Sequence, residues 1–252
     1  MNILWIFVLL LSKLYFHISG EIITYKTKYP YHIARKMYPK PTKSINYCKS
    51  LLCQKNVRHL TCETKFWGPK CGKSHEGVRL KKCMKNILDL HNTVRTRLNQ
   101  GLAHGLPQAN KLPLFEWDDE LALMAMRITN QCNEETANLC VNTYRFPNVA
   151  VTSDFVDLKK HPAKGMSFFV QNWWNQYRKI LPVHVAAFPA NASREMWMFA
   201  NIAYRKTHLV GCGMLDSGTK RFVTCVYNDK VGPGKRLYNV KPTAVNVSNA
   251  QL

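Results

Sequence analysis

The sequence lacks an apolar run long enough to cross a bilayer. The nearest candidate runs from Ile3 to Leu11, which is short of the roughly 20 apolar residues that a spanning helix needs. A short apolar run that ends in small residues such as Ser19 and Gly20 is typical of a secretory signal peptide. We therefore expect residues 1–20 to be a signal peptide and the mature chain to be secreted and extracellular; the alternative is a buried N-terminal strand.

The common hydrolase motifs are also missing. The sequence contains neither the Gly-x-Ser-x-Gly turn that exposes a nucleophilic serine nor the zinc-binding His-Glu-x-x-His pattern. The neighbouring carboxylates Asp119 and Glu120 resemble a catalytic pair, but acids at the start of an apolar periodic segment are typical of a helix N-terminus. We therefore predict no catalytic residues and expect that the protein is not an enzyme.

Acidic residues are scarce: 15 Asp and Glu stand against 36 Lys and Arg, a formal net charge of +21. Residues 21–90 hold 16 of the cations and 4 acids, a net of +12, whereas residues 91–252 hold 19 and 11, a net of +8. This balance favours contact with an anionic surface, although the same charge also serves to keep a secreted protein in solution. Nucleic acid is not an expected partner of a secreted chain. The candidate basic surface consists of Lys26, Lys28, Arg35, Lys36, Lys40 and Lys43.

A hydrophobic content of 46% excludes a disordered or fibrous chain and suffices for one domain with a small appendage. Nine cysteines indicate a disulfide framework in an oxidising compartment, and the odd count leaves one thiol over. Five of them lie within 36 residues, from Cys48 to Cys83, in a segment with little apolar periodicity. This segment is interpreted as a stapled basic extension without a core of its own. Asn191 and Asn246 begin Asn-x-Ser sequons and are candidate glycosylation sites.

Helical and strand patterns follow from residue 84 onward. Apolar residues from Ile87 to Leu98 recur at helical spacing, which predicts a helix that ends near Gly101 and carries His91 on or beside its buried side. We interpret His91 as a core or interhelical histidine whose hydrogen bonds are satisfied. Asp118 is the expected N-cap of the next helix. The remaining patterns predict a strand at 148–152, helices at 165–180 and 195–204, and strands at 207–215 and 220–228.

The register of the last two strands follows from their connection. If Gly218 and Thr219 form a two-residue loop with glycine first, the numbers of opposed residues sum to 437. This register places Asp216 opposite Arg221 and Cys212 opposite Cys225. We therefore predict a disulfide across this hairpin.

An ordered set of motifs resembles the insect antigen 5-like (venom allergen 5-like) proteins of the CAP superfamily, named for cysteine-rich secretory proteins, antigen 5 and pathogenesis-related 1. The resemblance covers roughly residues 45–232. The motifs are Tyr47-Cys48, Leu52-Cys53, His59-Leu60-Thr61-Cys62, Trp67-Gly68-Pro69-Lys70-Cys71-Gly72, Leu90-His91-Asn92 with Arg95, Trp117-Asp118-Asp119-Glu120, Asn130-Gln131-Cys132, Val210-Gly211-Cys212-Gly213 and Cys225-Val226-Tyr227.

The resemblance implies an α+β fold, an alpha-beta-alpha sandwich with a disulfide-stapled basic N-terminal extension. The corresponding divisions are a signal peptide at 1–20, the extension at 21–83, the CAP domain at 84–230 and a C-terminal tail at 231–252. Cys83 is the one cysteine outside the family pairing, available as a thiol or for a bond between chains. The pairs that the family implies are Cys48 to Cys62, Cys53 to Cys140, Cys71 to Cys132 and Cys212 to Cys225.

The resemblance also implies a central cleft, in which many CAP proteins hold two histidines and two glutamates suited to a divalent metal. No histidine occurs in residues 105–160 or 185–207, and no carboxylate occurs in residues 158–194, so an alignment shift does not restore this set. We therefore expect neither a metal nor another cofactor. The positions of the four ligands are occupied by Ala137, Pro147, Gln176 and Met198.

Three functions remain. The first is a non-catalytic binding protein of a venom, salivary or reproductive-tract secretion, whose partner is an extracellular protein, a glycan or an anionic membrane surface. The second is a carrier of a small apolar ligand such as a sterol or fatty acid, as implied for some CAP relatives. The third is a hydrolase, which the missing ligand set disfavours. We expect the first function and a monomer.

Overall fold

The structure is a computed structural model, and it describes residues 46–49, 52–63, 65–72, 75–77, 80–134, 139–162 and 164–242. The expected signal peptide, the six residues of the candidate basic surface, Ala137 and Asn246 lie outside these ranges. None of the helices within these ranges combines the length and the apolar composition that crossing a membrane requires.

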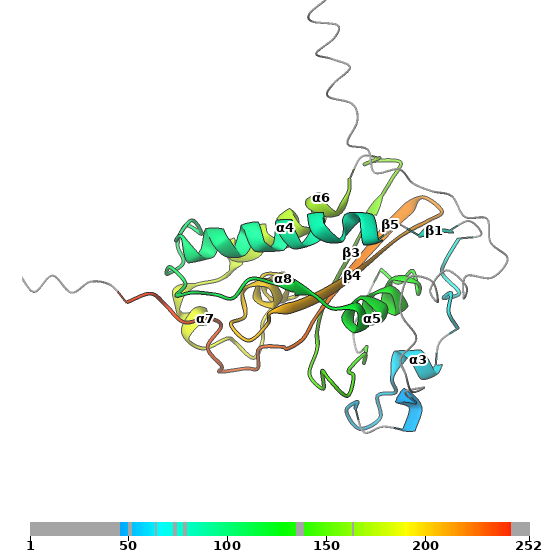
Figure 1. Cartoon of the computed structure of the whole chain (residues 1–252), viewed down its shortest axis with the longest axis horizontal. Helices are drawn as coiled ribbons and strands as arrows, with labels where there is room; N and C mark the ends of the chain where they lie inside the picture. The colour runs from blue at the N-terminus through cyan, green and yellow to red at the C-terminus, as the bar shows by residue number, and fades with distance from the viewer. Residues whose placement is uncertain are drawn as a thin grey trace, which may run out of the picture.

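A five-stranded sheet runs through the centre of the fold (Figure 1). β4 pairs on one side with β5, which pairs in turn with β3. On the other side β4 pairs with β1 at one end and with β2 at the other, so these two short strands share an edge. All pairs are antiparallel except β2 with β4. The strands are β1 (His75–Gly77), β2 (Glu116–Trp117), β3 (Ala150–Asp157), β4 (Leu209–Ser217) and β5 (Lys220–Tyr227).

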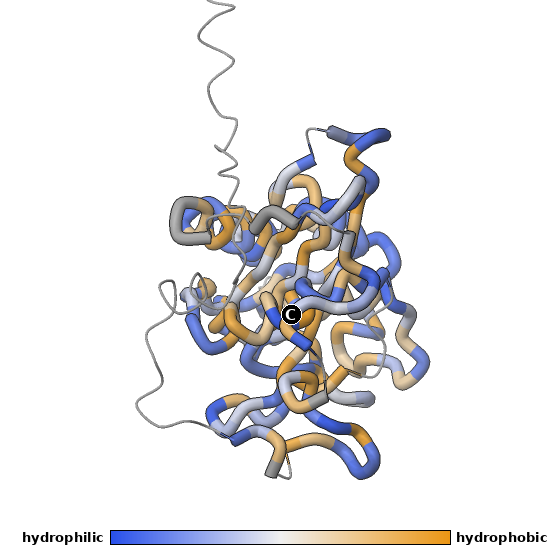
Figure 2. Tube along the Cα trace, turned by 90° about the vertical axis from the view of Figure 1, so that its right-hand side faces the viewer, coloured by the Kyte–Doolittle hydropathy of each residue, from blue (hydrophilic) through white to orange (hydrophobic). Residues whose placement is uncertain are grey.

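Helices cover both faces of the sheet, which confirms the α+β sandwich. Successive side chains of a strand point to opposite faces. Cys225 and Tyr227 of β5 accordingly join a core formed with α4, α6 and α8, whereas Val226 joins a second core formed with α5. Figure 2 shows the hydrophobic segments gathered inside and the hydrophilic ones on the outer loops. The helices are η1 (Tyr47–Lys49), α3 (Leu60–Glu63), α4 (Leu80–Asn99), α5 (Asp119–Thr129), α6 (Met166–Asn175), η2 (Gln176–Lys179), α7 (Pro182–Ala186) and α8 (Arg194–Ala203).

The predicted hairpin register is confirmed. β4 and β5 pair Asp216 with Arg221 and Cys212 with Cys225, and the connecting Gly218 has a φ of 59°. A left-handed backbone at this position suits glycine, which has no Cβ. The Arg221 guanidinium donates to both carboxylate oxygens of Asp216, at 2.6 and 2.7 Å, so an ion pair fastens the end of the hairpin.

The two predicted helix signals at α4 and α5 are also confirmed. Ile87, Val94 and Leu98 of α4 are buried, and Gly101 follows the end of the helix with a φ of 75°. The side chain of Asp118 accepts hydrogen bonds from the backbone N–H groups of Glu120 and Leu121 and so caps α5. Asp119 and Glu120 follow in the first turn of α5, where acidic side chains stabilise a helix N-terminus.

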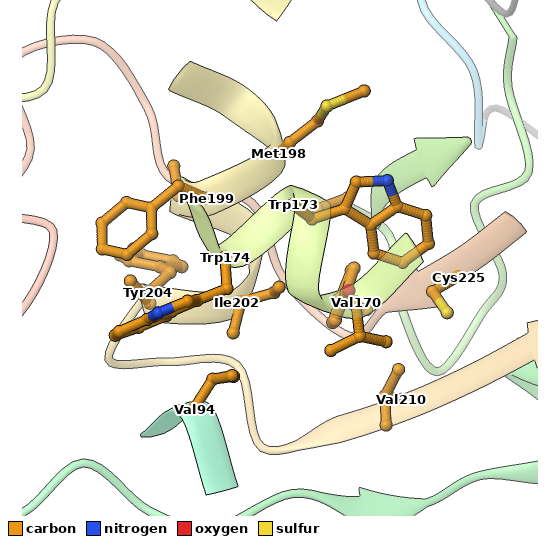
Figure 3. Close-up of a cluster of buried hydrophobic side chains, with 14 of the residues drawn as sticks. Val94, Val170, Trp173, Trp174, Met198, Phe199, Ile202, Tyr204, Val210 and Cys225 are labelled. Atoms are coloured by element: carbon orange, nitrogen blue, oxygen red, sulfur yellow. The ribbon is translucent and has the colours of Figure 1, made fainter. Parts of the chain in front are cut away.

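Large aromatic side chains fill the core between α6 and α8. Trp173 and Phe199 are fully buried and Trp174 is nearly so, and Figure 3 shows them in one buried cluster that also includes Val94 of α4 and Val210 of β4. The rings of Trp174 and Phe199 lie 5.6 Å apart. These tryptophans therefore pack helices against the sheet.

Several boundaries differ from those predicted, most of them by one or two residues, and three of the differences matter for the fold. β3 extends to Asp157 instead of ending at Thr152, because its whole length pairs with β5 and this pairing carries the polar Ser153 and Asp154 within the strand. The helix expected at 165–180 ends as an α-helix at Asn175 and continues as the 3₁₀ turn η2.

The third difference concerns the expected tail at 231–252. Its described part, residues 231–242, packs Val231, Leu237 and Tyr238 into the main core. Leu237 N–H donates to Val185 O of α7, and Phe188 N–H donates to Lys235 O. These residues therefore belong to the folded unit.

Candidate functional site

The described positions that the resemblance assigns to metal ligands offer poor ones. Met198 on α8 is 6% exposed and belongs to the main core, in the cluster drawn in Figure 3. Gln176, at the end of α6, donates from Nε2 to Asn172 O at 3.0 Å. Pro147 lies exposed in the loop before β3. A thioether, an amide bonded to its own helix and a proline ring are not ligands that zinc prefers.

A polar network lies beside these positions, where β3, α6 and α8 meet. Arg194 of α8 donates from Nη2 to Ser153 O at 2.7 Å, and the same nitrogen lies 3.9 Å from Asp154 Oδ1. Asn172 of α6 donates to Asp154 Oδ2 at 3.4 Å. The Asp154 carboxylate is thus engaged by a cation and an amide. The sequence reasoning missed Arg194, although its position one turn before Met198 places both on one side of α8.

Asn201 lies on the same side of α8 as Arg194 and Met198, in the interior of the protein. It is 3% exposed and donates from Nδ2 to Val151 O at 3.1 Å and to Thr152 Oγ1 at 2.9 Å. The amide therefore fastens α8 to β3. Together with Arg194, it makes this junction a hydrogen-bonded helix-to-strand contact.

His91 has the structural role that the sequence predicts. It is fully buried, with Nδ1 2.8 Å from Ile87 O and Nε2 3.1 Å from the Tyr227 hydroxyl. Because a carbonyl only accepts, Nδ1 carries the proton and Nε2 accepts from Tyr227. Burial lowers the pKa of His91 to about 4, so the ring stays neutral at physiological pH.

Within the described residues, one group of three potential metal ligands lies close together: His91, Cys212 and Cys225. The two cysteines are joined in a disulfide. Thiolates, and not disulfide sulfurs, are the metal ligands that cysteine supplies. The group is therefore part of the core and does not offer a metal centre in this state.

Arg95 is a buried cation that fastens α4 to the end of α8. It donates to Ile202 O at 2.8 Å, to Tyr204 O at 2.9 Å and to Thr207 Oγ1 at 2.6 Å, and it also bonds Pro113 O. Its guanidinium carbon lies 3.7 Å from the centre of the Phe115 ring. Burial lowers the pKa of Arg95, whereas carbonyls at a helix C-terminus favour a cation. Arg95 is thus a structural anchor.

The structure forms the four disulfides that the resemblance implies, and two of them hold the N-terminal extension on the domain. Cys53 bonds to Cys140, and Cys71 bonds to Cys132. Beside the first bond, Asn142 Nδ2 donates to Leu52 O at 2.8 Å. Cys83, on α4 and partly exposed, belongs to none of the four.

His59 also stabilises the contact between the N-terminal extension and the domain. It is 3% exposed, donates from Nε2 to Asn142 O at 2.9 Å and lies 2.9 Å from Thr61 Oγ1 through Nδ1. Its ring stacks on Tyr47 with centroids 4.7 Å apart, and the Tyr47 hydroxyl donates to Glu120 Oε1 at 3.3 Å. Burial lowers the pKa of His59. The described extension is therefore seated on α5 through side chains that are already engaged.

The two sequons differ in what the structure describes. Asn191 lies exposed in the turn before α8, and Ser193 of the same sequon caps that helix by accepting from Met196 N–H at 3.3 Å. Asn246 lies outside the described residues. Glycosylation at both positions stays a prediction.

The fold and the motifs define a class of protein. Residues 88–227 match the family described as Cysteine-rich secretory protein family, CAP, and the chain belongs to this family. The match includes β2 through β5 and most of α4, and it leaves β1, the N-terminal extension and residues 231–242 outside.

Among curated proteins, the chain is 31% identical over 177 residues to Venom allergen-1 of Aedes albopictus, with 68% of each chain covered. It is 26% identical over 202 residues to Tabinhibitin 3 of Tabanus yao, covering 77% of this chain and 79% of the relative. Among solved structures, the fold is similar to venom allergen-like protein 4 of Schistosoma mansoni, with a TM-score of 0.52 and 18% identity over 63% of this chain and 94% of that one. The last likeness concerns the fold alone.

Proposed function

We propose that this protein is a secreted, non-catalytic CAP protein that acts outside the cell by binding a partner. The observation that carries the proposal is the chemistry of the expected ligand positions. Met198 is buried in the core, Gln176 is bonded to its own helix, and the neighbouring Asp154 is engaged by Arg194. Such a junction supports a rigid fold and supplies no set of groups for hydrolysis.

Secretion is supported by the disulfides and by the leader. Four disulfides are typical of proteins that fold in an oxidising compartment. The apolar run at Ile3 to Leu11 is of the length that a signal peptide has. The chain is also similar to proteins named venom allergens.

The proposed partner is an extracellular protein, a glycan or an anionic membrane surface. The name Tabinhibitin denotes an inhibitor, and inhibition by binding needs no catalytic residue. A rigid sandwich that carries loops and a stapled extension presents a fixed surface for such a partner. We propose that the protein does this as a monomer without a cofactor. Transport of a small lipid rests on the resemblance alone.

The proposal is tested by expressing the full chain in insect cells. We expect the protein in the medium, cleaved near Glu21, with no turnover of ester or peptide substrates with or without added zinc. We also expect its binding to immobilised extracellular proteins or glycans to be unchanged by EDTA. Retention inside the cell, or turnover that follows the protein through two different purification columns, would contradict the proposal.

A further inference from the structure

The short helix α7 presents apolar side chains to solvent at one end of the fold. Figure 1 shows α7 far along the long axis from α3 of the N-terminal extension. Leu181 is 55% and Val183 is 63% exposed, and Pro182 between them is exposed as well. Singly scattered apolar side chains are normal on a protein surface, whereas three in succession form a patch that favours contact with a partner.

The backbone of this patch is held in place by buried neighbours. Ile180 precedes the exposed residues and Val185 follows them, and both are buried in the main core. His184 N–H donates to Leu181 O at 2.9 Å, and Leu237 N–H donates to Val185 O at 2.9 Å. A partner would therefore meet a backbone that is already ordered, so that little conformational entropy is lost on contact.

Exposed cations accompany the patch. Arg178 and Lys179 directly precede it at the end of η2, and both are exposed. Lys235 and Arg236 are also exposed. They belong to a segment that lies beside the end of α7, because Phe188 N–H donates to Lys235 O at 2.9 Å. The apolar patch and these four cations thus share one end of the fold.

The charge at this end is positive. Residues 176–192 and 231–242, which the structure describes in full, hold five Lys or Arg and no Asp or Glu. The Glu195 carboxylate of α8 attracts Lys179 and offsets part of this charge. The residues outside the described ranges carry positive charge as well, since they hold nine Lys or Arg against two Asp or Glu. The field at this end therefore favours an anionic partner.

We propose that this end of the fold, which we call the α7 surface, docks on a bilayer that carries anionic lipids. This inference rests on the proposed binding function and selects one of its partner classes. Leu181 and Val183 enter the boundary between headgroups and acyl chains, while the cations stay among the lipid phosphates. The α7 surface consists of Arg178, Lys179, Leu181, Pro182, Val183, Lys235 and Arg236.

Other occupants match only part of this surface. A second copy of the chain is repelled, because each copy carries a formal net charge of +21. A sulfated glycan would pair with the cations but would leave Leu181 and Val183 in water. A bilayer offers both an anionic surface and an apolar interior. The combination of exposed apolar side chains with cations therefore favours a membrane.

The test measures binding of the full mature chain to vesicles of phosphatidylserine and phosphatidylcholine in equal parts, at physiological salt. We expect at least about tenfold weaker binding to pure phosphatidylcholine vesicles. Leu181→Asn with Val183→Asn should weaken binding to the mixed vesicles about tenfold or more, because two apolar side chains no longer leave water. The matched control is Leu102→Asn with Leu114→Asn, which replaces side chains that are 52% and 53% exposed in the segment after α4. We expect less than about a threefold change there.

A second pair of variants tests the charge. Arg178→Gln with Lys179→Gln should weaken vesicle binding about tenfold or more, since each cation near an anionic bilayer raises the affinity about fivefold. Lys159→Gln with Lys160→Gln removes the same charge from exposed residues after β3. We expect this control to weaken binding less than about threefold, because only screened long-range attraction is lost. Unchanged thermal denaturation verifies that each variant is folded.

Three results would overturn the inference. The first is an equal loss in the α7 variants and their controls. The second is a loss in the charge variant with none in Leu181→Asn with Val183→Asn, which is the behaviour of a purely electrostatic contact. The third is vesicle binding that requires the six cations of the candidate basic surface and not the α7 surface.

Two further outcomes separate this inference from its alternatives. A chain that ends at Pro242 should bind the vesicles as the full chain does, and a gain of about tenfold or more would show that residues 243–252 occupy the α7 surface, which would overturn the inference. Absence of vesicle binding by the wild type would overturn it too. If the secretion and turnover results hold in that case, the proposed function stands and its partner is an extracellular protein or a glycan.

Discussion

Replacement of Gly211 by alanine is expected to unseat α5 from the sheet. A Cβ at Gly211 would lie 2.5 Å from Ala122 Cα and from the carbonyl carbon of Leu121, and closer still to the backbone nitrogen of Ala122. All of these atoms belong to the backbone of α5, so no side-chain rotation relieves the contact. The close approach explains why glycine occupies this position in β4.

The magnitude follows from what must move. Real Cβ atoms essentially never approach a heavy atom within 3.0 Å, so α5 has to shift as a body and disturb its buried residues, among them Leu121, Met124 and Ile128. Overpacking of a core costs about 1 to 3 kcal/mol and occasionally more. We expect about 3 kcal/mol for Gly211→Ala, which corresponds to a Tm lower by about 6 to 12 °C in a domain of this size.

Thermal and chemical denaturation measure this effect, with Gly232→Ala as the matched control. At Gly232 a new Cβ would meet only Lys235 Cγ at 3.6 Å, an ordinary contact. We expect a change within about 0.5 kcal/mol for the control. Equal stability of the two variants would refute the described seating of α5 on β4.

Three other perturbations test the framework. Replacing Cys53 and Cys140 by serine removes a disulfide that closes a loop with a sequence separation of 87. We expect the free energy of unfolding to fall by about 4 to 5 kcal/mol, as the loop-entropy relation gives. A loss below about 1 kcal/mol in chemical denaturation would contradict this expectation. Arg95→Met leaves several buried acceptors without a donor, and we expect a loss of about 3 to 5 kcal/mol against the exposed control Arg97→Met; equal losses would refute the anchoring role. Below its ordinary pKa of 6.5, His91 is protonated in the unfolded chain but neutral in the fold, where its pKa is about 4. The contribution of His91 to the free energy of unfolding is therefore complete above pH 6.5 and falls by about 3 kcal/mol as the pH drops to about 4. Stability measured across this range should depend less on pH in His91→Gln, and an unchanged slope would contradict the assignment.

Local patterns predicted the parts of the fold that local chemistry determines. The two-residue loop at Gly218 determined the hairpin register, and Asp118 marked the start of α5. The apolar spacing of α4 predicted both the helix and the burial of His91. In each case the residues that determine the structure lie within a few positions of one another, so one sequence suffices.

Contacts between distant segments escaped prediction. The polar Ser153 and Asp154 interrupt the apolar pattern, so the sequence does not predict the second half of β3. This half forms a strand because it pairs with β5. The sequence around Leu237 gives no sign that this residue is folded, because its hydrogen-bond partner is the distant Val185 on α7. The approach of Arg194 to Asp154 joins α8 to β3, and no pattern in either segment predicts that contact.

The central claim is that the protein acts by binding, without a metal at the positions of Pro147, Gln176 and Met198. Equilibrium dialysis of the intact mature chain against zinc tests it most directly. We expect no stoichiometric zinc at micromolar concentrations, and we expect Ala137→His with Met198→His still to fall short of a tight site, because the two carboxylate positions stay substituted. One zinc ion per wild-type chain, bound at micromolar affinity or better and retained after replacement of His91, would contradict the account.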